Sequence, residues 1–110
     1  MATKQATIDL ILDAAAGAGR VSARKMFGEY GLYCDGVLVA LVCDGDLFVK
    51  PTVAGLAHIG EADLAPPYPG AKPCCRIDGG RWDDRDWMAT LLRITAAALP
   101  PPREKPKRRR

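Results

Sequence analysis

Two Asp-Gly pairs, at residues 35–36 and 44–45, constrain the fold more than any other feature of the chain. They separate three largely apolar runs, which are Glu29–Cys34, Val37–Cys43 and Asp46–Lys50. Asp-Gly between β-prone runs is a strong signal for a two-residue hairpin turn, because both residues tolerate positive φ. The stretch therefore predicts a three-stranded antiparallel meander.

Two-residue turns fix the register of this meander by counting. The expected pairs are Gly28 with Cys43, Cys34 with Val37, Cys43 with Asp46, and Val39 with Lys50. One face would then carry Tyr30, Leu32, Cys34, Val37, Val39, Leu41, Cys43 and Phe48, and the other Glu29, Gly31, Tyr33, Leu38, Ala40, Val42, Leu47 and Val49. Both faces are largely apolar, whereas a sheet with one solvated face alternates apolar and polar residues. We expect helices on one face, tightly packed over Gly31 and Ala40, and a second cover or a partner chain on the other.

Amphipathic segments flank the meander. Apolar residues at helical spacing predict a helix over residues 5–16, and Val21–Met26 reads as an irregular first strand. A longer apolar stripe predicts a second helix from Asp83 or Asp84 to Leu99, with Trp87 packed in the core. Its early acidic residues, Asp83, Asp84 and Asp86, suit capping better than metal binding.

The region between the meander and the last helix is less regular. Thr52–Ile59 has a plausible N-cap threonine but is weakened as a helix by Gly55. Four prolines make Glu61–Pro73 a constrained loop that we expect to cross an edge of the sheet. Cys74–Ile77 reads as a short strand before a turn at residues 78–80. The predicted fold class is α+β, a two-layer domain with an antiparallel meander flanked by N- and C-terminal helices.

The charge distribution divides the 110 residues into two parts. Residues 100–110 hold six of the sixteen Lys and Arg residues and one of the thirteen acidic residues, a net charge of +5, so residues 1–99 carry −2. We expect residues 1–99 to form one domain and residues 100–110 a disordered, proline-rich basic tail. The tail cations that could follow a nucleic-acid backbone weakly, without reading its sequence, are Lys105, Lys107, Arg108, Arg109 and Arg110. The alternative is a purely solubilising tail.

Several functional classes lack support in the sequence. No apolar run approaches the about 20 residues of a membrane span, and no secretion signal is visible, so we expect a cytoplasmic protein with reduced thiols. The predicted register places Cys34 and Cys43 about 20 Å apart, and adjacent Cys74 and Cys75 should point to opposite faces, which disfavours a shared zinc ion. His58 reads as a surface histidine without a nucleophile nearby. We expect no catalytic residue, metal or cofactor.

Four motifs together resemble the N-terminal domain of the TfoX/Sxy family. They are Met26-Phe27-Gly28, Tyr30-Gly31-Leu32-Tyr33, the loop from Tyr68 to Pro73, and the helix with Trp87 that ends in residues 95–100, and the match runs from about Ala6 to Pro100. The resemblance implies an antiparallel α/β domain similar to secretion-chaperone-like folds. The family includes competence regulators, which usually carry a second, helical domain and are thought to act with the cyclic-AMP receptor protein. For this chain we expect the basic tail to stand in place of that second domain.

The resemblance implies a small non-enzymatic regulatory or adaptor protein that acts through protein contacts, with the transcription machinery or the cyclic-AMP receptor protein as possible partners. The alternative is a chaperone-like dimeric interaction module unrelated to transcription. The residues we assign to partner binding lie in the loop motif and are Tyr68, Pro69, Gly70 and Lys72. Lys72 would bind a carboxylate or phosphate, or would simply be an exposed lysine.

Overall fold

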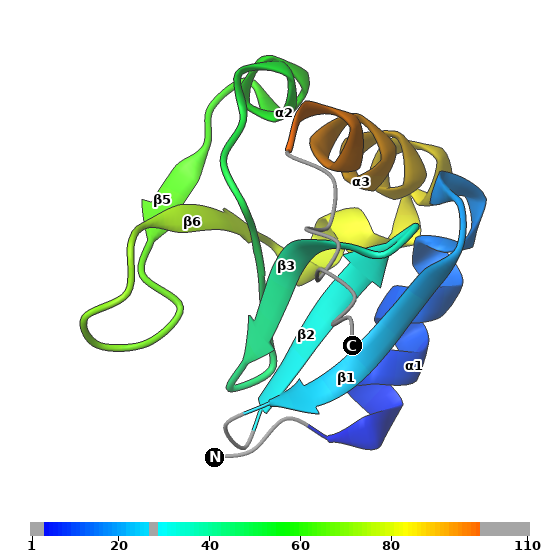
Figure 1. Cartoon of the computed structure of the whole chain (residues 1–110), viewed down its shortest axis with the longest axis vertical. Helices are drawn as coiled ribbons and strands as arrows, with labels where there is room; N and C mark the ends of the chain where they lie inside the picture. Colours follow the sequence, from blue (N-terminus) through cyan, green and yellow to red (C-terminus); the bar gives the residue numbers. More distant parts are fainter. Residues whose placement is uncertain (1–3, 27–28, 100–110) are drawn as a thin grey trace, which may run out of the picture.

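The computed structural model describes residues 4–26 and 29–99. This part of the chain forms a six-stranded antiparallel sheet with strand order β1-β2-β3-β4-β6-β5 (Figure 1). The strands are β1 Val21–Met26, β2 Glu29–Cys34, β3 Val37–Cys43, β4 Asp46–Val49, β5 Asp63–Ala65 and β6 Cys74–Ile77. The helices are α1 Gln5–Ala14, α2 Val53–Ile59 and α3 Arg85–Ala98, with short 3₁₀ turns η1 Ala16–Ala18 and η2 Gly79–Asp83.

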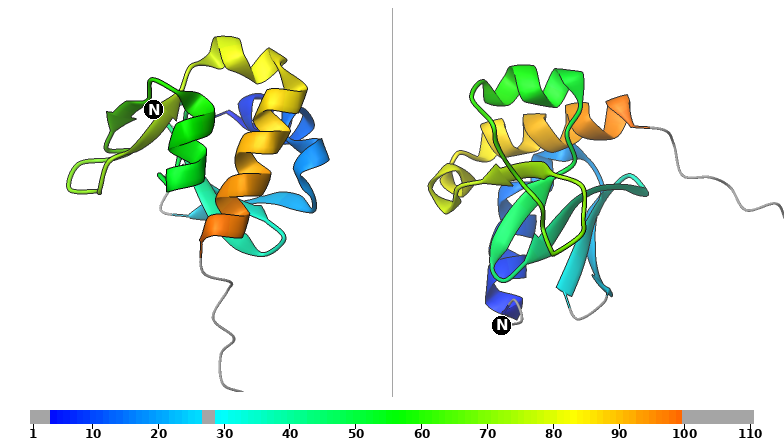
Figure 2. Two further views of the ribbon diagram at one scale, coloured as in Figure 1. Left: turned by 90° about the horizontal axis from the view of Figure 1, so that it is seen from above. Right: turned by 90° about the vertical axis from the view of Figure 1, so that its left-hand side faces the viewer.

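Helices α1 and α3 pack on one face of the sheet, and α2 packs on α3 (Figures 1 and 2). The core between the layers is apolar and centred on fully buried side chains of both helices and the central strands, among them Ile8, Ile11, Leu32, Val42, Leu47, Met88, Leu91 and Leu92. The predicted α+β class, with N- and C-terminal helices on an antiparallel sheet, is confirmed.

Both Asp-Gly pairs form the predicted tight turns. Positive φ values occur at Asp35 (52°) and Gly36 (85°), and again at Asp44 (55°) and Gly45 (80°). Two consecutive positive φ values define the type I′ turn that matches strand twist. The strand Val21–Met26, expected to be irregular, pairs along its whole length with β2 and extends the meander to four strands.

A β-bulge in β3 shifts the predicted β2–β3 register by one residue, whereas the predicted β3–β4 register is confirmed. Cys34 pairs with Val37 and Tyr33 with Leu38, as counted, but Leu32 pairs with Ala40, which leaves Val39 as an extra residue. The pairing of Cys43 with Asp46 across the second turn is as predicted. Because a one-residue shift exchanges the two faces of a strand, Ala40 and Val42 join Tyr30 and Leu32 on the core face.

The two predicted face sets are therefore mixed. Leu41 and Phe48 lie on the face away from α1 and α3, opposite to Tyr30 and Leu32. Gly31 pairs with Leu41 on that outer face while Ala40 is buried in the core, so the expected helix contact over both residues is wrong. Counting from turn length cannot reveal a bulge, because the extra residue lies inside an unbroken apolar run.

Local capping explains the helix boundaries. The Thr52 hydroxyl accepts a hydrogen bond of 2.9 Å from the Gly55 amide and begins α2, as the sequence predicts. The Asp84 carboxylate accepts one of 3.1 Å from the Trp87 amide and begins α3. Helix α1 ends at Ala14, two residues before its predicted end, because the chain tightens into η1.

The region 61–73 contains a strand where we predicted only a loop. β5 forms the far edge of the sheet and pairs with β6, which itself lies beside β4. Its three residues precede the first proline, so their amide donors are intact, but a run this short carries no visible period. Part of the segment that we predicted to cross the sheet edge is therefore itself the edge strand.

Candidate functional site

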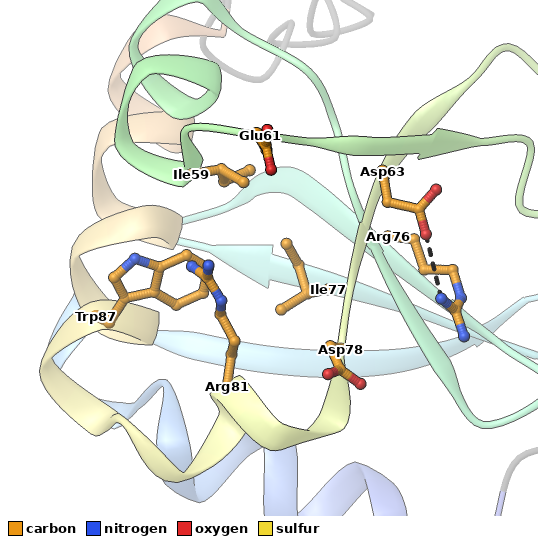
Figure 3. A pocket seen from close by; sticks show the side chains of 8 residues that line it. All are labelled: Ile59, Glu61, Asp63, Arg76, Ile77, Asp78, Arg81 and Trp87. Atoms are coloured by element: carbon orange, nitrogen blue, oxygen red, sulfur yellow. Dashed lines mark hydrogen bonds and ion pairs between the residues drawn. The ribbon is translucent and has the colours of Figure 1, made fainter.

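A cavity of about 240 Å³ opens where the end of α2 and the β5–β6 hairpin meet the start of α3 (Figure 3). We call it the Trp87 cavity. Its lining residues are Ile59, Glu61, Asp63, Arg76, Ile77, Asp78, Arg81 and Trp87. They come from α2, β5, β6, η2 and α3 and from the connections before β5 and η2, so no single sequence motif predicts the cavity.

Trp87 forms one wall of the cavity instead of being enclosed in the core as predicted. Its ring is half-buried, with the Arg81 guanidinium carbon 4.4 Å from a ring centroid. The His58 ring stacks on Trp87 with centroids 5.1 Å apart, and His58 Nε2 lies 3.2 Å from the Trp87 carbonyl oxygen. His58 is thus a half-buried partner of Trp87, where the sequence indicated a surface histidine. The sequence reasoning missed the contribution of Arg81 because Trp87 and Arg81 are brought together only by η2.

Arg76 forms the opposite wall and ties three strands together. Its Nε lies 3.4 Å from an oxygen of Asp46, and its Nη1 lies 3.2 Å from an oxygen of Asp63. The hydrogen bond from Arg76 to Asp63, with the nearby charge of Asp46, raises the pKa of Arg76 further above its ordinary value. These exposed pairs contribute little stability, but they neutralise Asp63 as a ligand group.

The remaining charges of the cavity are not paired within the described part of the chain. Glu61 and Asp78 are exposed, and neither carboxylate has an ion pair or side-chain hydrogen bond with another described residue. The Arg81 guanidinium contacts the Trp87 ring and has no carboxylate partner among the same residues. The lining carries three acidic and two basic side chains, so its formal net charge is −1.

The predicted loop residues form a defined turn away from this cavity's lining. The Ala71 amide donates a 3.0 Å hydrogen bond to the Tyr68 carbonyl, and Gly70 has a φ of 87°. Proline at the second position and glycine with positive φ at the third are typical of a type II turn. We call residues 68–71 the Tyr68 turn. Tyr68 is 53% exposed, and Pro69, Gly70 and Lys72 are exposed as well. The structure therefore brings all four predicted partner-binding residues together at one surface.

The outer face of the sheet carries apolar side chains over the meander. Within the described chain, no helix lies on this side of β1, β2 and β3 (Figure 1). Half-buried residues here include Tyr33, Leu38, Leu41 and Cys43, and the Arg24 guanidinium lies 5.4 Å from the Tyr33 ring centroid. We call these residues the outer sheet patch.

The cysteines are four free thiols, and burial raises the pKa of each of them. Cys34 and Cys43 lie at opposite ends of β3's pairing region, as predicted, and the described residues contain no group of three or more potential metal ligands. The basic residues Lys105, Lys107, Arg108, Arg109 and Arg110 lie outside the described residues.

Comparison with known families accounts for the motifs on this fold. A family model described as the TfoX N-terminal domain matches residues 13–99. The chain belongs to the TfoX N-terminal domain family. The matched region includes the sheet, the Trp87 cavity and the Tyr68 turn, and it falls within the resemblance drawn from the motifs.

A similar protein is known from Spirochaeta aurantia. It is named an uncharacterized 12.7 kDa protein in the trpE 5′ region, and it is 39% identical over 103 residues, which are 94% of this chain and 89% of the relative. This TfoX N-terminal domain and its relative thus align over most of the length of both chains. In the part of the chain that the structure describes, every helix falls short of the length and apolar content needed to cross a membrane.

Proposed function

We propose that this TfoX N-terminal domain is a small, non-enzymatic regulatory or adaptor protein that acts by binding another protein. The observation that carries the proposal is the Tyr68 turn, which presents a 53% exposed tyrosine on a hydrogen-bonded type II turn. Tyrosine is enriched at protein interfaces, and a preformed turn loses little conformational entropy when it binds. Lys72, four residues after Tyr68 in the chain, adds a cation that suits a carboxylate of the partner.

Exposed apolar area on β5, which precedes the turn in the chain, supports the same proposal. Leu64 on the edge strand β5 is 53% exposed, four residues before Tyr68. Pro67, which is buried, lies between them in the chain and directly precedes the turn. A binding surface needs an apolar centre and a polar rim, and Leu64, Tyr68 and Lys72 supply these two components.

The non-enzymatic part of the proposal rests on the placement of the groups that could act as base or nucleophile. His58 Nε2 is within hydrogen-bonding distance of the Trp87 carbonyl oxygen, and its ring is stacked on that tryptophan. Ser22, the single serine of the sequence, lies on β1, at the other end of the strand order from β5. Nucleophilic catalysis requires the base and the nucleophile to lie within hydrogen-bonding reach of each other.

A pull-down from native lysate tests the proposal, with RNA polymerase, the cyclic-AMP receptor protein and DNA scored separately. Tyr68→Ala should abolish capture of the protein partner, and Lys72→Gln should weaken it. The matched control is Val53→Ala. Val53 is 88% exposed on α2, so this substitution also removes exposed apolar area. Equal capture by Tyr68→Ala and the wild type would remove the Tyr68 turn from the binding surface.

A second candidate is the chaperone-like dimeric module, which the outer sheet patch favours. Contiguous apolar area without a cover is a common mark of an interface, and the patch spans β2 and β3. Light scattering at rising protein concentration tests it. A dimeric mass that Leu41→Lys converts to a monomeric one would support this candidate, whereas a monomeric wild type at high concentration would reject it.

A further inference from the structure

The Trp87 cavity presents two unpaired carboxylates across an apolar floor. Figure 3 shows Glu61 and Asp78 on opposite sides of Ile77, and neither is paired with another described residue. Asp63 is already engaged by Arg76, and Arg81 already contacts the Trp87 ring. The unpaired charges left for an occupant are therefore the two carboxylates and the Arg81 guanidinium, a net charge of −1, beside the aliphatic side chains of Ile59 and Ile77. A cation on an apolar stem, as in lysine or arginine, matches this arrangement.

We propose that the Trp87 cavity docks a lysine or arginine side chain from the chain's own residues 103–110, in an intramolecular contact. That segment holds six basic residues and one acidic residue, whereas residues 1–99 have a net charge of −2. Complementary charge favours the encounter and suppresses occupants with acidic side chains.

The basic segment can reach the cavity from where it leaves the fold. Trp87 lies in the first turn of α3, and Leu99 follows the last. Twelve residues of helix separate them by about 18 Å. Residues 100–105 span up to about 20 Å when extended, so the cations from Lys105 onward come within range of the Trp87 wall of the cavity.

Attachment to the same chain decides which occupant fills a weak site. A contact between exposed charges is weak and is screened by salt. A short tether, however, supplies an effective concentration in the millimolar range. A site with millimolar affinity is therefore about half filled by the attached segment, while a free basic peptide at micromolar concentration leaves it empty.

When the tail is docked, the domain competes with polyanions for the basic residues of the tail. A lysine or arginine held between Glu61 and Asp78 cannot contact a phosphate at the same time. Neutralising these two carboxylates should therefore strengthen any salt-dependent binding of polyanions by residues 103–110, although the sheet and the Tyr68 turn are unchanged.

The test uses the ¹⁵N-labelled full chain and the indole N–H signals of its two tryptophans. The wild type is compared with a tail variant in which five cations are replaced by glutamine, K105Q/K107Q/R108Q/R109Q/R110Q. At about 20 mM salt the Trp87 signal should differ between the two proteins, and at about 0.5 M salt the difference should disappear because screening is then nearly complete. The signal of Trp82, which does not line the cavity, serves as the internal reference.

Three carboxylate variants locate the contact. E61Q and D78N should each reduce the Trp87 difference between the two tails, and E61Q/D78N should remove it. The control is D9N, which neutralises an exposed aspartate of α1 outside the cavity and should leave the difference intact. The exchanged side chains are exposed, and peak dispersion in the same spectra verifies folding. Identical Trp87 signals for both tails at low salt, a difference that persists in E61Q/D78N, or one that grows with protein concentration would each overturn the intramolecular proposal.

Discussion

Gly55→Ala should destabilise the protein, although alanine favours helix and Gly55 is inside α2. A Cβ at residue 55 would lie 3.0 Å from the Thr52 hydroxyl oxygen and 3.3 Å from the Thr95 hydroxyl oxygen. Neither oxygen can give way easily. Thr52 Oγ1 is held by the hydrogen bond that begins α2, and Thr95 is fully buried in α3, where a β-branched side chain has little χ1 freedom.

Opposing contributions set the magnitude. Replacing glycine by alanine in a helix interior gains about 0.8–1.0 kcal/mol. Disturbing the Thr52 cap lowers the free energy of unfolding by about 1 kcal/mol. Overpacking a close contact lowers it by about 1–3 kcal/mol more. The net expectation is a destabilisation of about 1–3 kcal/mol, dominated by the overpacking.

Urea unfolding of Gly55→Ala and of Gly79→Ala measures this difference directly. Gly79 is the matched control because an added Cβ there meets nothing within 4 Å and its φ is not positive. Its replacement should be neutral or stabilising by up to about 1 kcal/mol. Equal unfolding free energies for the two variants would show that α2 and α3 are not in the close contact described above.

Three further predictions concern other parts of the molecule. Trp87→Ala should lower the free energy of unfolding by about 2 kcal/mol, below the 3–5 of a fully buried tryptophan, because the ring is half-buried; a loss under about 1 kcal/mol in urea would place the ring outside the packed structure. Since burial raises the pKa of the Cys34 and Cys75 thiols, the native state holds these protons longer than the unfolded chain, so stability should fall as the pH rises through about 8.5. Urea melts between pH 7.5 and about 9.5 check this sign, with Cys75→Val expected to flatten the slope, and a stability that increases over the range contradicts it. Duplex DNA binding by the basic tail should show a slope of log affinity against log salt of about −4.5 if five phosphates are neutralised, and K105Q/K107Q/R108Q/R109Q/R110Q should remove it; equal binding by both proteins at low salt would eliminate the tail as a nucleic-acid contact.

Features set by neighbouring residues were predictable from sequence. The type I′ turns follow from Asp-Gly, because these residues accept positive φ with little strain. The starts of α2 and α3 follow from Thr52 and Asp84, whose side chains bond to amides three residues away. The exposure of the Tyr68 turn follows in the same way from Pro69-Gly70. In each case the physical cause lies within four residues.

Features set by contacts between distant segments were not predictable. Val39 is an extra residue in β3 only relative to the pairing of β2, so the register error had no local signal. β5 is a strand only because β6 lies beside it. The Trp87 cavity was not predictable for a related reason, since Ile59, Arg76 and Trp87 meet only after α2, β6 and α3 have packed.

The position of β6 between β4 and β5 bears on the order of folding. β1 to β4 pair with immediate neighbours across short connections, but β4 pairs with β6 only after α2 and β5 have been passed, with Val49 opposite Cys75. Closing a loop of this length is slower than closing a hairpin, so the meander should form first and the β5–β6 hairpin dock later. An edge strand with few buried side chains, such as β5, also opens at a lower free energy than the rest of a domain. One wall of the Trp87 cavity therefore belongs to the late-forming hairpin and the other to α3, and amide hydrogen exchange in β5 and β6 should report the opening of the cavity separately from global unfolding.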